Sequence, residues 1–202
     1  MSIFEKQTRK DVYTHLFLFV SVLVFANQML AQNKLEKEYR LPIKEVPVKA
    51  IAFVDSLEFK NKVKWYMEIG MQEKSVEAKA SKDRQKYSIE FDIEGRLQDI
   101  EIEKKWMEIP SLVREKIVCY LDTIFKKNTI QKIQVQYSGT NKNLWSLLTN
   151  QIKTVPYKIK YELIVKGSFL KERELYEFLF SEKGDFEKKT KIIFRSTDNL
   201  EF

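Results

Sequence analysis

Hydrophobic residues recur at intervals of three and four residues between positions 46 and 57 of the chain. Val46, Ala50, Phe53, Val54 and Leu57 fall on one face of a helix at this spacing. Pro47 stands where the first turn of that helix would begin, which suits proline because its missing N–H needs no partner there. The pattern predicts an amphipathic helix that buries one face.

Between residues 62 and 103 the pattern changes to alternation of apolar and polar side chains. Four segments show it, which is typical of half-buried strands: residues 62–69, 75–81, 86–93 and 97–103. The sequence Glu94-Gly95-Arg96 predicts a hairpin turn between the last two. Trp65 falls on the apolar side of the first strand, so we expect it in the core.

The second half of the chain repeats this order of elements. Pro110 lies 63 residues after Pro47, and Val113, Ile117 and Leu121 continue a helix stripe behind it. Alternating segments follow at residues 129–139, 157–167, 172–186 and 188–194, and the third of them includes a turn at Gly184. A repeat of this kind constrains a fold more than any single motif does.

This repeat predicts an α+β fold made of tandem units, each with one helix packed on a four-stranded antiparallel sheet. Packing the helix on the sheet buries one sheet face of each unit and leaves the other free. A unit of this size would be marginally stable alone, so we expect the two units to pack together, with one continuous sheet as an open alternative. The expected domains are residues 1–31 as a signal peptide, 32–106 as the first unit and 107–202 as the second. The second unit carries an inserted loop, 138–158, in which Trp145, Leu147 and Leu148 suggest a short helix.

Residues 1–31 have the three parts of a secretory signal peptide. Lys6, Arg9 and Lys10 precede an apolar run from Val12 to Ala26, and cleavage is expected after Ala31 or after Ala26. The apolar run is short for a helix that spans a membrane, which needs about 20 residues. We therefore expect a periplasmic or secreted protein without a stable membrane anchor.

Composition narrows the chemistry of the exported chain. The only histidine, His15, lies in the signal segment, and Cys119 is the only cysteine. A zinc site made of cysteine and histidine is excluded, because too few of these ligands are present. Catalysis by a nucleophile and a histidine is excluded as well, because the histidine base is missing. Residues 1–31 carry three basic and two acidic groups, so the net charge of +7 becomes about +6 after cleavage. Both signs are interspersed, which favours a solvated surface over an anion-binding patch.

Several of these segments together resemble the PepSY-like, beta-lactamase-inhibitor-like proteins that Bacteroidetes bacteria secrete. The similarity rests on residues 45–59, 62–70, 75–103, 108–121 and 132–139 and extends over about residues 36–202. It implies tandem units of a helix and an antiparallel sheet in the cell envelope. It also implies use of the open sheet face against another protein, although a fold alone transfers no target.

The free face of the first sheet supplies the candidate partner-binding residues. These are Lys64, Tyr66, Glu68, Glu77, Lys79 and Glu90, and Trp145 in the inserted loop joins them as an aromatic that either folds back or meets a partner. The acidic residues Asp92, Glu94, Asp99, Glu101 and Glu103 invite a calcium interpretation. The ligand spacing of an EF-hand loop is absent, and a hairpin with charged outer positions explains them better.

Two classes of function remain open at this point. The first is an exported, non-enzymatic module that binds or inhibits another envelope or secreted protein through its open sheet face. The alternative is an envelope module that senses stress by binding a small ligand or an anion, such as an anionic glycan or lipid. No cofactor, metal or nucleic acid is expected, and an enzyme has only dispersed carboxylates in its favour.

Overall fold

The computed structural model describes residues 32–34, 37–70, 73–149, 156–169 and 172–192. The proposed signal peptide, residues 1–31, lies outside this range, so its cleavage stays a prediction. Among the described residues, no helix has the length and apolar character needed to cross a membrane.

Three α-helices lie in the described chain, and the first two begin in the same way. The 3-10 turns η1 (Ile43–Glu45) and η2 (Trp106–Glu108) lead to Pro47 and Pro110, which precede α2 (Val48–Asp55) and α3 (Ser111–Ile124). Both prolines have φ near the value that their ring imposes, −57° and −53°. The third helix, α4 (Asn141–Thr149), is the short helix suggested for the inserted segment.

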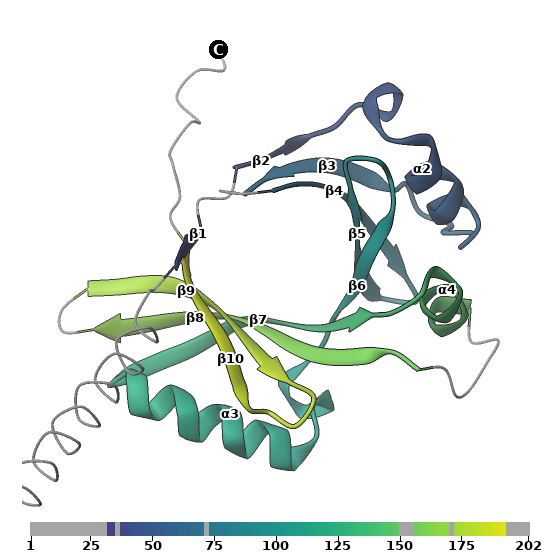
Figure 1. The fold of residues 1–202 in the computed structure, drawn as a ribbon. Coiled ribbons are helices and arrows are strands. Elements are labelled where there is room, and N and C mark those ends of the chain that lie inside the picture. The colour runs from purple at the N-terminus through teal and green to yellow at the C-terminus, as the bar shows by residue number, and fades with distance from the viewer. Residues whose placement is uncertain (1–31, 35–36, 71–72, 150–155, 170–171, 193–202) are drawn as a thin grey trace, which may run out of the picture. The chain divides into compact units, whose positions relative to one another are not determined.

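The strands occupy the segments where side chains alternate. After β1 (Gln32–Lys34) and β2 (Lys37–Arg40), the first half contributes β3 (Lys64–Ile69), β4 (Lys74–Lys82), β5 (Gln85–Asp92) and β6 (Leu97–Glu103). The second half contributes β7 (Lys127–Ser138), β8 (Lys158–Phe169), β9 (Glu172–Ser181) and β10 (Phe186–Ile192). Strands β2 to β10 form one antiparallel sheet in the order β10-β9-β8-β7-β6-β5-β4-β3-β2, and β1 stands next to β10 in this order (Figure 1).

The prediction of tandem units, each with its own four-stranded sheet, is wrong. Strands β6 and β7 pair from Asp99 opposite Ser138 to Glu103 opposite Gln134, so both halves share a single sheet. In the predicted arrangement β6 would be an exposed edge strand with unpaired N–H and C=O groups. Pairing with β7 satisfies these groups, which is the physical reason for a continuous sheet.

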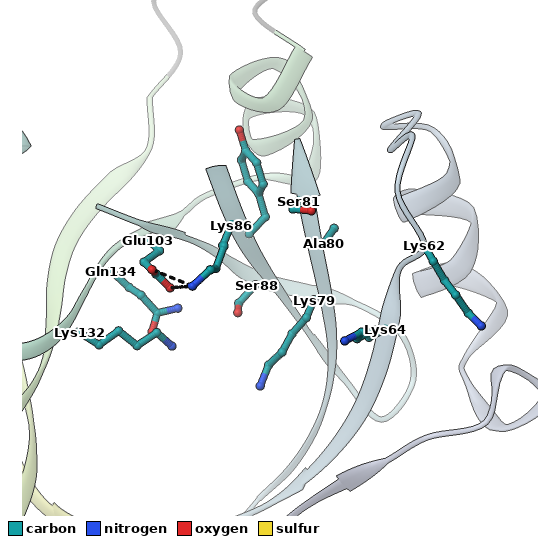
Figure 2. Close-up of a pocket in the computed structure, with 11 residues that line it drawn as sticks. Lys62, Lys64, Lys79, Ala80, Ser81, Lys86, Ser88, Glu103, Lys132 and Gln134 are labelled. Carbon is teal, nitrogen blue, oxygen red and sulfur yellow. Dashed lines mark hydrogen bonds and ion pairs between the residues drawn. The ribbon is translucent and has the colours of Figure 1, made fainter. Parts of the chain in front are cut away.

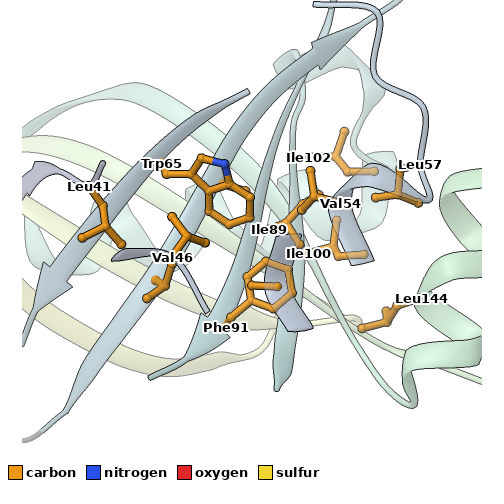
Figure 3. Close-up of a cluster of buried hydrophobic side chains, with 13 residues drawn as sticks. Leu41, Val46, Val54, Leu57, Trp65, Ile89, Phe91, Ile100, Ile102 and Leu144 are labelled. Atoms are coloured by element: carbon orange, nitrogen blue, oxygen red, sulfur yellow. The ribbon is translucent and has the colours of Figure 1, made fainter. Parts of the chain in front are cut away.

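One face of the sheet is apolar and is covered by the helices. Residues of α2, α4 and β3–β6 form one buried cluster that includes Trp65, Phe91 and Leu144 (Figure 3), and Trp65 is in the core as predicted. Residues of α3 and β7–β9 form a second cluster around Ile117, Leu163 and Phe178. Tyr137 on β7 packs against both clusters and so lies where they meet.

Two glycines fix the hairpin turns against the helices. Gly95, between β5 and β6, has φ +77°, and a Cβ there would lie 2.8 Å from Cβ of Pro47. Gly184, between β9 and β10, has φ +78°, and a Cβ would lie 3.0 Å from the main-chain oxygen of Val113. Both turns therefore need glycine for backbone conformation and for close approach to the start of a helix.

The opposite face of the sheet, called the polar face below, is concave. One hollow on it is lined by residues from Glu68 on β3 to Lys188 on β10. These strands stand seven places apart in the sheet order, which would separate them by about 33 Å in a flat sheet. The sheet must therefore curve toward its polar face, as its ribbon does in Figure 1.

Candidate functional site

The polar face brings six of the seven predicted binding residues together. Tyr66, Glu77 and Glu90 lie directly opposite one another on β3, β4 and β5. Lys64 and Lys79 form the neighbouring pair on β3 and β4, and Glu68 lies opposite Ser75. Although the sequence places Glu77 on the free face of the sheet, the residue is buried, with 4% of its surface exposed.

Trp145, the seventh predicted residue, lies on the other face of the sheet. Its helix, α4, packs on the apolar face, and the Trp145 ring rests against the core cluster around Phe91. The indole Nε1 donates a hydrogen bond to Oγ of Ser56 at 3.1 Å. Trp145 thus folds back onto the body of the protein and shares no surface with the other six residues.

Lys79 is the positive centre of the predicted group. Its Nζ lies 2.9 Å from Oε1 of Glu38, 3.0 Å from Oε2 of Glu77 and 4.7 Å from the centre of the Tyr66 ring. Burial works to lower the pKa of Lys79, but the charges and hydrogen bonds of Glu77 and Glu38 outweigh it and raise the pKa above its ordinary value. The guanidinium of Arg40 lies over the same Tyr66 ring, 5.4 Å from its centre. Two cations therefore already contact the aromatic ring that the sequence offers as an anchor.

A hollow of about 380 Å³ opens at one end of the polar face and is rich in lysine (Figure 2). We call it the lysine hollow. Its lining is Lys62, Lys64, Lys79, Ala80, Ser81, Lys86, Tyr87, Ser88, Glu103, Lys132 and Gln134. Figure 2 shows the Lys86 ammonium pointing at Glu103, with which it forms an ion pair at 3.0 Å, and Lys132 beside Gln134. Glu103 is the only acidic group of this lining, so the hollow carries a positive charge.

A second hollow, of about 500 Å³, adjoins it on the polar face and is strongly acidic. We call it the acidic hollow. Its lining is Glu68, Gly70, Glu73, Glu90, Gln98, Asp99, Glu101, Gln136, Glu162, Glu177, Leu179 and Lys188. Ser88 of the lysine hollow lies directly opposite Glu101 of the acidic hollow, so the two meet across one pair of strands.

The acidic hollow raises the pKa of three carboxyl groups. Burial is the main cause for Asp99, followed by the charge of Glu77, and its pKa reaches about 7. Burial and then the charge of Asp99 raise the pKa of Glu90, while burial and then the charge of Glu162 raise that of Glu101. Each of the three carboxyl groups therefore keeps its proton to a higher pH than an ordinary carboxyl group does.

Asp92 and Glu94, two of the five acidic residues considered above as calcium ligands, belong to the hairpin turn. This is the explanation that the sequence favoured for them. The carboxylate Oδ1 of Asp92 accepts hydrogen bonds from the main-chain N–H groups of Glu94 and Arg96, at 3.0 and 2.8 Å. Asp92 and Glu94 both form ion pairs with Arg96. These contacts stabilise the turn, so neither carboxylate is available as a loop ligand.

Sequence reasoning missed the part of the site that comes from the second half of the chain. It treated Asp99 and Glu101 as solvated outer positions, whereas Glu101 is 5% exposed. It also named neither Lys132 nor Glu162, because it took the candidate binding residues from the free face of the first sheet alone. The available signal was the run of acidic residues at alternate positions of β6, which predicts a row of like charges on one face.

Comparisons with known proteins give two distant structural similarities. No family model matches the chain, and no curated protein matches it. It is similar to a solved DUF2874 family protein from Bacteroides uniformis, with 11% identity and a TM-score of 0.48, over 72% of this chain and 89% of that one. It is also similar to a Bacteroides eggerthii protein named for an assumed periplasmic location, with 11% identity and a TM-score of 0.46, over 72% of this chain and 88% of that one. At these TM-scores the similarities carry no argument, and the PepSY-like family stays a prediction.

Proposed function

We propose that this protein is an exported, non-enzymatic binding module that takes up an anionic ligand group in its lysine hollow. The observation that carries the proposal is the gathering of five lysines around one hollow of about 380 Å³ that contains a single acidic group. Small-molecule sites typically have volumes of about 300–1,000 Å³. The hollow has the size and the charge for a phosphate, sulfate or carboxylate group and part of the molecule that bears it.

Three of the five lysines in the lining, Lys62, Lys64 and Lys132, form no ion pair within the described chain. The other two, Lys79 and Lys86, are paired with glutamates. Ser81, Ser88 and Gln134 also line the hollow and can donate hydrogen bonds. Ammonium and hydroxyl donors that converge on one point stabilise a bound anion through charge-assisted hydrogen bonds.

The lack of histidine after residue 31 favours binding over nucleophilic catalysis. The sequence after residue 31 contains no histidine, and its one cysteine, Cys119, is exposed on α3, away from both hollows. Nucleophilic catalysis by cysteine or serine needs an adjacent base. The carboxyl groups of the acidic hollow are the chemically unusual groups of the described chain, and a binding role accounts for them as discussed below.

Export of the protein is part of the same proposal and rests on residues 1–31. Fractionation of cells that produce the full chain would place the product in the envelope or the medium. Mass spectrometry of its N-terminus would show whether Gln32 or Asn27 comes first, as expected for cleavage after Ala31 or Ala26. An intact N-terminus on a cytoplasmic product would contradict export.

A protein partner is the second candidate, and one observation favours it. The three described helices all pack on the apolar face, which leaves the polar side of strands β3 to β9 without a covering helix. A free sheet face of this kind can receive a partner segment with complementary charges. An acidic segment would use the same lysines as an anionic glycan or lipid, so one set of variants tests all three sources.

Binding of defined anions to the purified protein is the appropriate test. The probes are a heparin oligosaccharide for glycans, vesicles with phosphatidylglycerol for lipids and a polyglutamate peptide for acidic protein segments. The test variant is Lys64→Gln/Lys132→Gln. Its control is Lys44→Gln/Lys49→Gln, which removes the same charge from exposed positions on η1 and α2.

We expect at least one probe to bind the wild type, with an affinity at least tenfold lower for the Lys64→Gln/Lys132→Gln variant and nearly unchanged for the control. Binding should weaken with salt, because exposed charges are screened over about 10 Å at 0.1 M. The strongest probe identifies the source of the ligand. Equal loss in both double variants would mean attraction by net charge alone and would overturn the lysine hollow as a site.

A further inference from the structure

The acidic hollow contains three carboxylates at a distance suited to one metal ion. Glu90 on β5 and Asp99 and Glu101 on β6 each offer an oxygen atom, and these oxygens all lie within 4.8 Å of one another. Calcium binds oxygen at about 2.3–2.6 Å, so ligands on opposite sides of the ion lie about 4.6–5.2 Å apart. A single ion can therefore contact all three groups with little movement of the strands.

Glu101 provides independent evidence for a ligand. Its side chain lines the hollow with only 5% of the residue exposed, and in the described part of the chain no hydrogen bond or ion pair reaches its carboxylate. Oδ1 of Asp99 is also buried without a hydrogen bond, and Oδ2 accepts only a long one, 3.3 Å, from Gln136. A buried carboxylate without a partner is unfavourable by several kcal/mol, so it calls for a proton or a cation.

A neighbouring acidic group on the same face illustrates the difference. Glu38, Glu68 and Glu77 also have oxygens within 4.8 Å of one another. There, however, the ammonium of Lys79 contacts both Glu38 and Glu77 and supplies the positive charge. The cluster of Glu90, Asp99 and Glu101 has no such ammonium group within ion-pair distance among the described residues.

We propose that Glu90, Asp99 and Glu101 bind a divalent cation of the calcium type in the acidic hollow. All three donors are hard carboxylate oxygens, which select calcium, magnesium or manganese over zinc or copper. Calcium fits best because it accepts irregular geometry and carboxylates that bind through one or both oxygens, whereas magnesium demands a near-ideal octahedron. Water in the hollow of about 500 Å³ can complete the six to eight ligands that calcium takes.

Other charged groups face the three carboxylates from neighbouring strands and loops. They are Glu68 on β3, Glu73 before β4, Glu77 on β4, Lys132 on β7, Glu162 on β8, Glu177 on β9 and Lys188 on β10. Most of these groups are acidic, so they add to the attraction of a cation.

The test is calorimetric titration of the purified, chelator-treated protein with calcium chloride at about pH 8, repeated with magnesium chloride. Glu101→Gln keeps the shape of the side chain and removes its charge, and Asp99→Asn serves as a second variant. Glu115→Gln is the control, because it removes one acidic charge from an exposed position on α3. Circular dichroism and thermal unfolding of each variant show that it has folded.

We expect one saturable calcium event in the wild type, with a dissociation constant on the order of 10⁻⁵–10⁻³ M and weaker binding of magnesium. Both site variants should bind calcium at least tenfold more weakly, and the control should match the wild type. The proposal is overturned if calcium up to about 10 mM gives no saturable binding to the wild type, or if Glu101→Gln binds it equally well. A third result would also overturn the proposal. If Glu101→Gln unfolds at a higher temperature than the wild type, and calcium does not change the unfolding temperature of the wild type, the carboxylates bind protons and no cation.

Discussion

Glu90 lies directly opposite Asp99 in the antiparallel pair of β5 and β6. Like charges in this relationship repel each other, and Glu77 continues the row on the other side of Glu90. A row of three acidic groups on adjacent strands is unfavourable for folding unless something neutralises it. This row is accordingly the part of the molecule whose stability should respond most to pH and to cations.

Stability without divalent cations should decrease as the pH rises from about 5 to about 8. The folded protein binds the Asp99 proton more tightly than the unfolded chain does, because its pKa is raised from 3.8 to about 7. The resulting stabilisation is complete below the unfolded value and is lost as the pH rises through the folded one. The raised pKa values of Glu90 and Glu101 act in the same direction.

Urea unfolding at about pH 5, 6.5 and 8 in the presence of a chelator measures this effect. We expect the free energy of unfolding to fall by roughly 2–4 kcal/mol over this range. Asp99→Asn should show a flatter dependence because asparagine does not titrate. A free energy that rises steadily up to about pH 8 in the wild type would contradict the raised pKa values.

Lys79 should contribute to stability mainly by neutralising Glu77. Lys79→Met leaves the buried Glu77 carboxylate without its ammonium partner, which we expect to lower the free energy of unfolding by roughly 1–3 kcal/mol. The double variant Lys79→Met/Glu77→Gln should recover much of this loss, because the buried charge is then absent. Denaturant unfolding of the wild type, both single variants and the double variant gives the coupling energy, and a value near zero would contradict the pairing.

Local patterns predicted the helices and strands well, but they could not predict how the two halves join. Alternation placed Trp65 in the core and glycine in both turns, because burial of a face and backbone conformation depend on nearby residues. The pairing of β6 with β7 depends on hydrogen bonds between main-chain groups, which leave no trace in side-chain type. Without that pairing, nothing in the sequence places Lys132 or Glu162 next to Glu101, so the lysine and acidic hollows could be predicted only in part.

We expect position 167 to require glycine because of the neighbouring Phe125 ring and not because of its backbone conformation. The aromatic ring of Phe125, at the end of α3, lies where a Cβ of Gly167 on β8 would be. Gly167→Ala should therefore force the ring to move and destabilise the protein by roughly 1–3 kcal/mol. In a Phe125→Leu background, Gly167→Ala should destabilise the protein less. Denaturant unfolding of the wild type, the two single variants and the double variant measures this difference. Strict additivity of the two changes in free energy would contradict the contact.

Gly95 should tolerate alanine poorly for two reasons that act together. Its φ of +77° disfavours any side chain, and the new Cβ would lie 2.8 Å from Cβ of Pro47 and 3.1 Å from the main-chain N of Ala50. We expect Gly95→Ala to lower the free energy of unfolding by roughly 2–4 kcal/mol, because both the turn and the start of α2 must shift. Gly139→Ala is the matched control, since its φ is not in the left-handed region and its nearest neighbour, the main-chain oxygen of Pro156, is 3.4 Å away. Thermal and denaturant unfolding should place the free energy of unfolding of the control within about 0.5 kcal/mol of the wild-type value. If Gly95→Ala also lies that close to the wild type, α2 does not pack against this turn as described.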